Sequence, residues 1–208
     1  MSAGDCALVT AAGHGVGRAC AEALRDESID LYLVDADHNR VEAAAERLDA
    51  HAITSALADA GEAESCVATV LTARSRLDIL VHVLATPAAI SLADVSAREW
   101  REQVEAPLAV TLFLSRAALR AMSVRPGGQV LLVAPWAAVD GPAAGPLVTV
   151  VDTALHALTR ELAPLADELE ATLRLVTPHG LEPCLSDANR ASTPAEAAVI
   201  SALLATTA

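Results

Sequence analysis

The stretch that decides the fold is Val9-Thr10-Ala11-Ala12-Gly13-His14-Gly15-Val16-Gly17, close to the start of the chain. Three glycines lie between an apolar run over 7–10, which predicts a buried strand, and an amphipathic stretch over 16–26, which predicts a helix. Glycines in such a turn let the backbone approach a pyrophosphate, and the amino end of the helix attracts the phosphate charge. The pattern predicts a dinucleotide-binding strand–turn–helix unit.

An acidic residue, Asp35, closes the next apolar run, over 31–35. A carboxylate there accepts hydrogen bonds from the adenosine ribose and repels a 2′-phosphate, so we expect NAD to be preferred over NADP. Asp59, which follows a weaker strand candidate over 51–57, is expected to meet the adenine edge. Alternatively, the glycines serve only close helix–strand packing and both aspartates are solvated loop ends. The predicted cofactor-binding residues are Thr10, Gly13, Gly15, Gly17, Asp35 and Asp59.

The rest of the chain continues the alternation of short apolar runs and amphipathic stretches. Further strands are expected over 79–85, 130–134 and 173–177, and helices over 39–49, 62–74, 97–124, 147–170 and 194–204. Strand and helix in turn predict an α/β fold: one doubly wound, Rossmann-like parallel sheet with helices on both faces. No linker interrupts the pattern, so we expect a single domain over 1–208.

Composition excludes several classes of partner. The net charge of −13 is spread along the 208 residues, and without a basic stripe neither nucleic acid nor an anionic membrane surface is an expected partner. The four cysteines lack metal-ligand spacing, so no metal is expected. Cys6 and Cys20 lie in apolar stretches and are expected in the core. With no secretion signal and no membrane-spanning run, we expect a cytoplasmic protein.

The sequence resembles the short-chain dehydrogenase/reductase family over nearly its whole length. Thr10, Gly15 and Gly17 match the family motif Thr-Gly-x-x-x-Gly-x-Gly, while Ala11 stands where the first glycine should be. Trp100 and the run over 158–163 fit the family pattern without gaps. Because the chain stops at Ala208, the resemblance implies a sheet that lacks the family's last strand.

The resemblance also implies that the family's catalytic groups are missing. In the family a tyrosine passes a proton to or from the substrate oxygen, a lysine lowers its pKa, and a serine orients the substrate. The family's asparagine, serine, tyrosine and lysine fall on Pro107, Pro135, Val148 and Asp152. Neither valine nor proline can transfer a proton, and an aspartate has the wrong charge to stabilise a phenolate. The only tyrosine, Tyr32, lies in the second strand, so we expect a degenerate member of the family.

The altered pocket is expected to contain Pro135, Trp136, Val148 and His179. Asp152 and His156 are four residues apart and share a helix face, which makes them a candidate acid–base pair. The alternative is that His156 is a packed, hydrogen-bonded residue without a catalytic role.

Three functions follow from this reading. The first is non-redox chemistry, such as cyclisation, isomerisation or dehydration of a small, largely apolar molecule. The second is a non-catalytic regulatory or structural partner of an active homologue, or a nucleotide sensor. The third is an NAD-dependent oxidoreductase with a relocated proton donor. We expect a small-molecule ligand, and a homodimer through the two long helices or a heteromer with a homologue.

Overall fold

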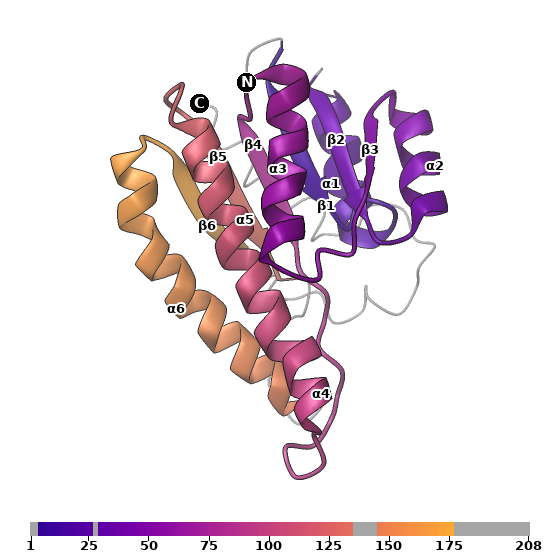
Figure 1. Cartoon of the computed structure of the whole chain (residues 1–208), viewed down its shortest axis with the longest axis vertical. Helices are drawn as coiled ribbons and strands as arrows, with labels where there is room; N and C mark the ends of the chain where they lie inside the picture. The colour runs from indigo at the N-terminus through magenta and orange to yellow at the C-terminus, as the bar shows by residue number, and fades with distance from the viewer. Residues whose placement is uncertain (1–3, 27–28, 135–144, 177–208) are drawn as a thin grey trace.

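The computed structural model describes residues 4–26, 29–134 and 145–176. Its six strands form one parallel sheet in the order β3-β2-β1-β4-β5-β6 (Figure 1). The reversal of order beside β1 is the mark of a doubly wound sheet, so the predicted fold class is confirmed. The strands are β1 (Cys6–Thr10), β2 (Asp30–Asp35), β3 (His51–Thr54), β4 (Ile79–Val83), β5 (Gln129–Val133) and β6 (Thr172–Val176).

Helices cover both faces of the sheet, because alternate strand residues point to opposite sides. Ala7 and Val9 of β1 pack in one core cluster with α1 (Gly15–Asp26) and α2 (His38–Leu48). Cys6 and Leu8 pack on the other face, in a cluster with residues of α3 (Ala60–Arg74), α5 (Ala106–Met122) and α6 (Pro146–Glu168). Cys6 and Cys20 are both buried, as predicted.

The helix predicted over 97–124 is interrupted by one wider turn. It consists of α4 (Ala97–Trp100), a π-helical turn η1 (Arg101–Glu105) and α5. Pro107 causes the change, because it lacks an N–H and its ring clashes with the carbonyl four residues earlier. The Ala106 N–H instead donates to the Arg101 carbonyl, five residues back. By contrast, α6 continues through Pro164.

Other boundaries differ from the predicted ones by a few residues. The predicted strands over 79–85 and 51–57 end earlier, at Val83 and Thr54. The helix expected over 194–204, and any strand after β6, lie outside the described residues. No helix in the described part of the chain is long and apolar enough to cross a membrane.

Candidate functional site

The glycine-rich turn joins β1 to α1 in an unusual backbone conformation. Ala11 has a φ of 51° and Gly15 a φ of 53°, both in the left-handed region that favours glycine. A Cβ at Gly17 would lie 2.2 Å from the Ala11 carbonyl oxygen, so α1 packs directly on the end of β1. The space at Gly15 is open, and the first turn of α1 carries no acidic side chain. Close packing therefore explains Gly17, whereas Gly15 leaves room for a ligand.

Asp35, at the end of β2, fixes this turn through hydrogen bonds. Its Oδ2 accepts from the Gly13 N–H at 3.0 Å, and its Oδ1 accepts from the Asp37 N–H at 3.0 Å. The Nδ1 atom of His14 lies 3.5 Å from Oδ2. A Cβ at Gly13 would be 2.9 Å from the same oxygen, so glycine is needed there. Because Asp35 is only 6% exposed and accepts these two hydrogen bonds, its carboxylate has a fixed position and is not a solvated loop end.

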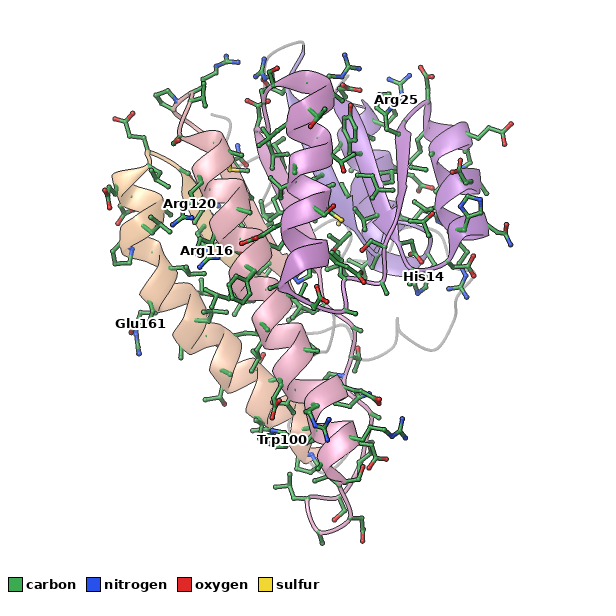
Figure 2. All side chains as sticks on the ribbon, in the orientation of Figure 1. His14, Arg25, Trp100, Arg116, Arg120 and Glu161 are labelled. Atoms are coloured by element: carbon green, nitrogen blue, oxygen red, sulfur yellow. The ribbon has the colours of Figure 1, made fainter. Side chains whose placement is uncertain are left out.

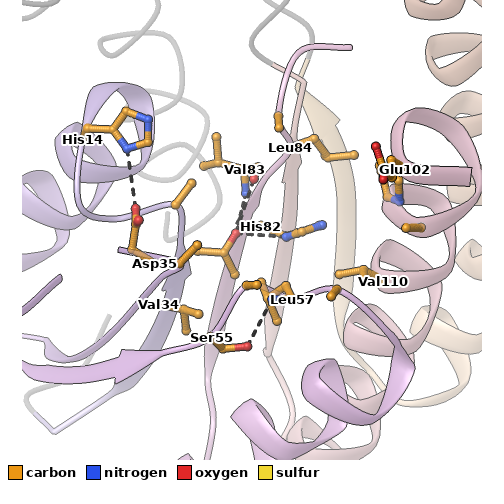
Figure 3. Close-up of a pocket in the computed structure, with 18 residues that line it drawn as sticks. His14, Val34, Asp35, Ser55, Leu57, His82, Val83, Leu84, Glu102 and Val110 are labelled. Atoms are coloured by element: carbon orange, nitrogen blue, oxygen red, sulfur yellow. Dashed lines mark hydrogen bonds and ion pairs between the residues drawn. The ribbon is translucent and has the colours of Figure 1, made fainter. Parts of the chain in front are cut away.

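A cavity of about 460 Å³ opens at the carboxyl ends of β1, β2 and β4 (Figure 3). The glycine turn and Asp35 form one side of it, and residues of η1 and α5, among them Glu102 and Val110, lie opposite. Ligands of doubly wound sheets bind at this edge, where the strand order reverses. The remaining lining is mostly apolar and comes from the segments that follow β2, β3 and β4.

The loop after β3 forms the third side of the cavity and is held by Glu62 of α3. The Glu62 Oε2 accepts from the Ser55 hydroxyl at 2.8 Å and from the Ala58 N–H at 3.3 Å. Ala58 lines the cavity, whereas Asp59 caps α3 by accepting from the Glu62 N–H at 2.9 Å. Asp59, which we predicted at the adenine edge, therefore caps α3, and the neighbouring Ala58 forms part of the cavity wall.

A fully buried polar chain runs beneath the cavity, from β1 through β4 to α5. Thr10 Oγ1 lies 2.9 Å from Nδ1 of His82, and His82 Nε2 lies 3.2 Å from Oγ1 of Thr111. The Thr111 hydroxyl donates to the Pro107 carbonyl at 2.7 Å, and the Val83 N–H donates to Thr10 Oγ1 at 2.9 Å. Since the Thr111 hydroxyl donates its proton to the Pro107 carbonyl, its oxygen acts as the acceptor toward His82. The neutral His82 ring therefore carries its proton on Nε2.

Burial keeps this imidazole neutral. Desolvation lowers the pKa of His82 to about 4, and its side chain is 5% exposed. Both ring nitrogens are already hydrogen-bonded, so His82 ties three elements together below the site.

The positions expected to carry catalysis do not form an acid–base centre in the cavity. Val148 is 5% exposed and packs in a buried cluster with Leu84 and Leu155. Pro107 is among the residues that line the cavity. Asp152 and His156 do share a face of α6, with Oδ2 and Nε2 3.7 Å apart, but their side chains are 31% and 60% exposed, and neither is among the lining residues.

The sequence has one tyrosine and no lysine that could stand in for the catalytic groups that we expect to be missing. Tyr32 is buried in β2, where its ring stacks on His51 with centroids 4.5 Å apart. All 14 basic residues of the sequence are arginines, so the chain contains no lysine. The expected pocket residues Pro135, Trp136 and His179 lie outside the described residues.

Sequence reasoning missed several residues that shape the site. Asp59-Ala60-Gly61-Glu62 is a capping pattern, and it signals that Asp59 starts a helix. The sequence shows no pattern that would place Glu102 or Val110 on the cavity, since both reach it only through the packing of η1 and α5.

Comparisons with known proteins place the chain in a family. A family model described as short chain dehydrogenase matches residues 5–193. Dehydrogenase/reductase SDR family member 4 of Bos taurus is 30% identical over 164 residues, which cover 76% of this chain and 58% of that protein. The chain thus spans less than two thirds of the length of that curated relative.

Two solved structures show the same fold. L-sorbose reductase from Gluconobacter frateurii, complexed with NADPH and L-sorbose, superposes with a TM-score of 0.77 and 23% identity over 85% of this chain and 69% of that one. A metagenomic short-chain oxidoreductase in complex with NADP gives a TM-score of 0.77 and 24% identity over 98% and 91%. The family model, the relative and the shared fold agree: this chain belongs to the short-chain dehydrogenase/reductase family.

Proposed function

We propose that this chain binds an NAD-type dinucleotide without transferring a hydride, and acts as a nucleotide-dependent binding or regulatory protein. The observation that carries the proposal is the contrast between the two halves of the site. Asp35 and the glycine turn are held in place at the cavity, whereas Val148, which we align with the family's tyrosine, is packed in the core.

The residues present fit the adenosine half of such a cofactor. Asp35 presents a nearly buried carboxylate to the cavity, and Ala58 provides an apolar wall beside it. The open space at Gly15 and the amino end of α1 suit a pyrophosphate. When bound, the cofactor would supply a hydride donor or acceptor; the chain's own residues would hold its ribose and phosphates. With a negative charge at Asp35, we propose that NAD is preferred over NADP.

Several features argue against hydride transfer. A carbonyl substrate needs a proton donor within hydrogen-bond reach of its oxygen. Of the described polar lining residues, Thr10 and His82 are bonded to each other, Asp35 accepts from two backbone amides, and Ser55 donates to Glu62. The two exposed ones, His14 and Glu102, face Asp35 and Arg98. Asp152, the donor that a relocated mechanism would use, is paired with His156 away from these residues.

Non-redox chemistry on a small apolar molecule is the second candidate, and one residue favours it. Glu102 of η1 lines the cavity with an exposed side chain, and its Oε1 lies 3.2 Å from Nη1 of Arg98. A carboxylate in this place can take a proton from a ligand that enters over the apolar wall. If this chemistry occurs, Glu102→Gln abolishes it and leaves nucleotide binding unchanged.

Calorimetric titration with NAD, using cavity-blocking variants, tests the proposal. Ala58→Trp places an indole at the exposed cavity wall and should abolish binding without disturbing the core. Ala68→Trp is the matched control, since Ala68 is an exposed residue of α3 that does not line the cavity, and it should bind as the wild type does. Absence of binding by the folded wild-type chain, or equal binding by Ala58→Trp, would contradict the proposal.

We also propose a homodimer through the outer faces of α5 and α6, or a heteromer of the same geometry with a homologue. Arg116 and Arg120 of α5 and Glu161 of α6 lie along these two neighbouring helices (Figure 2). This surface carries both signs of charge, which suits self-association. Sedimentation should then give twice the chain mass of 21.3 kDa, and a monomer at all concentrations would rule the homodimer out.

A further inference from the structure

A second cavity, also of about 460 Å³, lies at the amino ends of the strands, opposite the cavity that we assign to the nucleotide. β1 begins beside it at Cys6, and Figure 2 shows Arg25 at this end of the sheet and His14 at the other. Three guanidinium groups meet here, in a chain whose net charge is −13. They belong to Arg25 near the end of α1, Arg74 at the end of α3 and Arg76 in the segment that follows α3.

We propose that this second cavity is a binding site for a phosphate group, separate from the site of the dinucleotide. A phosphate group presents oxygens in several directions, so donors on three different segments can reach it from different sides. Guanidinium groups suit it because each presents its N–H donors in a rigid fork and keeps its charge at every working pH. A planar carboxylate, by contrast, is satisfied by one such fork.

Arg25 supplies the charge that the anion meets. Its Nε donates to the Leu48 carbonyl at 2.7 Å, which fixes the guanidinium group at the cavity. The carboxylate nearest to it, that of Asp49, lies 3.8 Å from Nη2 and is 93% exposed, so water screens the pair. Most of the positive charge of Arg25 is therefore available to a ligand in the cavity.

The other two arginines are held by carboxylates and contribute N–H donors. Arg76 donates to Asp78 through Nε at 2.8 Å and through Nη2 at 2.6 Å, and Nη2 also donates to Asp5 at 3.0 Å. None of these three bonds uses its Nη1 atom. Arg74 is paired through Nε with Asp30, which also lines the cavity. Because a guanidinium group has five N–H donors, these pairs fix both side chains and leave donors for a ligand.

The small residues of the lining leave room for the anion. A Cβ at Gly4 would meet nothing within 4 Å, so the backbone there borders open space. Burial raises the pKa of the Cys6 thiol to about 12, which keeps this lining residue neutral. Among the described lining residues, the three arginines face two carboxylates, those of Asp30 and Asp49.

Titration of the folded protein with inorganic phosphate, followed by NMR through the backbone amides, tests the site. Chloride at the same ionic strength is the reference, because it screens charges equally. The Gly4 and Ile29 amides should shift until they saturate, while the Gly15 amide reports binding at the nucleotide cavity separately. Phenyl phosphate is titrated in parallel. Tighter binding of the ester would assign the site to a phosphorylated small molecule, and equal binding would assign it to free phosphate.

Two variants change the charge at this site in opposite directions. Arg25→Gln should weaken phosphate binding about tenfold, because it removes a charge-assisted hydrogen bond. Asp49→Asn should strengthen it about two- to fivefold, because it removes the exposed carboxylate that competes for Arg25. Asparagine also adopts the left-handed backbone of this position, so the second variant should fold.

Arg18→Gln is the matched control, since Arg18 lies on the same helix, faces Glu22 and does not line this cavity. It should bind phosphate as the wild type does. The absence of saturable shifts at Gly4 and Ile29 in the wild type would overturn the proposal. Equal binding by the wild type, Arg25→Gln and Asp49→Asn would overturn it as well.

Discussion

The glycine turn contains an alanine in a conformation that glycine adopts freely, and this makes Ala11→Gly a sharp test of the site's geometry. Ala11 has a φ of 51°. The left-handed region costs an L-residue about 1–2 kcal/mol, and glycine removes that cost. Glycine also makes the unfolded chain more flexible, which lowers stability by about 0.4–1 kcal/mol. Ala11→Gly is therefore expected to be as stable as the wild type or slightly more stable.

The neighbouring variant Ala12→Gly separates the two effects. Ala12 is fully buried, its N–H donates to the Val34 carbonyl, and it is not among the residues with positive φ. Its replacement carries the same unfolded-state cost and also loses a buried methyl group, worth about 0.8 kcal/mol, with no strain to relieve. Because the shared entropy cost cancels, Ala11→Gly should be about 2 kcal/mol more stable than Ala12→Gly.

Denaturant unfolding of the two variants, followed by circular dichroism, measures this difference. Similar losses of stability in both would refute the reasoning, because they would mean that Ala11 is not strained. The nucleotide affinity of Ala11→Gly should be no weaker than that of the wild type, since the turn keeps its shape.

Three further predictions concern residues around the site. Gly17→Ala should lose about 1–3 kcal/mol or fail to fold, because its Cβ would lie 2.2 Å from the Ala11 carbonyl oxygen; a melting curve like the wild type's would contradict that packing. Asp59→Ala should lose about 1 kcal/mol through the missing α3 cap, and Asp59→Asn, which also caps, should lose little; equal losses in thermal unfolding would argue against a cap. Because the unfolded chain protonates His82 near pH 6.5 and the folded chain only near pH 4, stability should fall by up to about 3 kcal/mol as pH drops through that window. His82→Asn should remove this part of the pH dependence, and an unchanged slope of stability against pH would show that His82 is not buried and neutral.

The sequence predicted the fold because the strands of a covered parallel sheet are short continuous apolar runs, separated here by amphipathic helical stretches. The apolar runs of β1, β2, β4 and β5 are buried on both sides, and such runs are easily recognised. The π-helical turn before Pro107 was harder to predict from the sequence. A proline indicates a disturbance of the helix without saying whether the helix kinks, widens or ends.

The site was predicted only in part, for a physical reason. Asp35 and the glycines act through local geometry, which spacing along the chain reports directly. Asp59 fits both an adenine-edge pattern and a helix cap; it does cap α3, and its contact with adenine stays a prediction. The role of His82 could not be predicted, because its bonds to Thr10 and Thr111 join residues that are 72 and 29 positions away, which no local pattern reveals.

The most direct measurement mixes the folded chain with NADH and follows both its fluorescence and its absorbance in the presence of a panel of aldehydes and ketones. Our account predicts a saturable change of NADH fluorescence, weakened by Ala58→Trp, and an absorbance that stays constant with every carbonyl compound. A steady loss of NADH absorbance in proportion to the amount of protein would show that a hydride is transferred, and it would contradict the account.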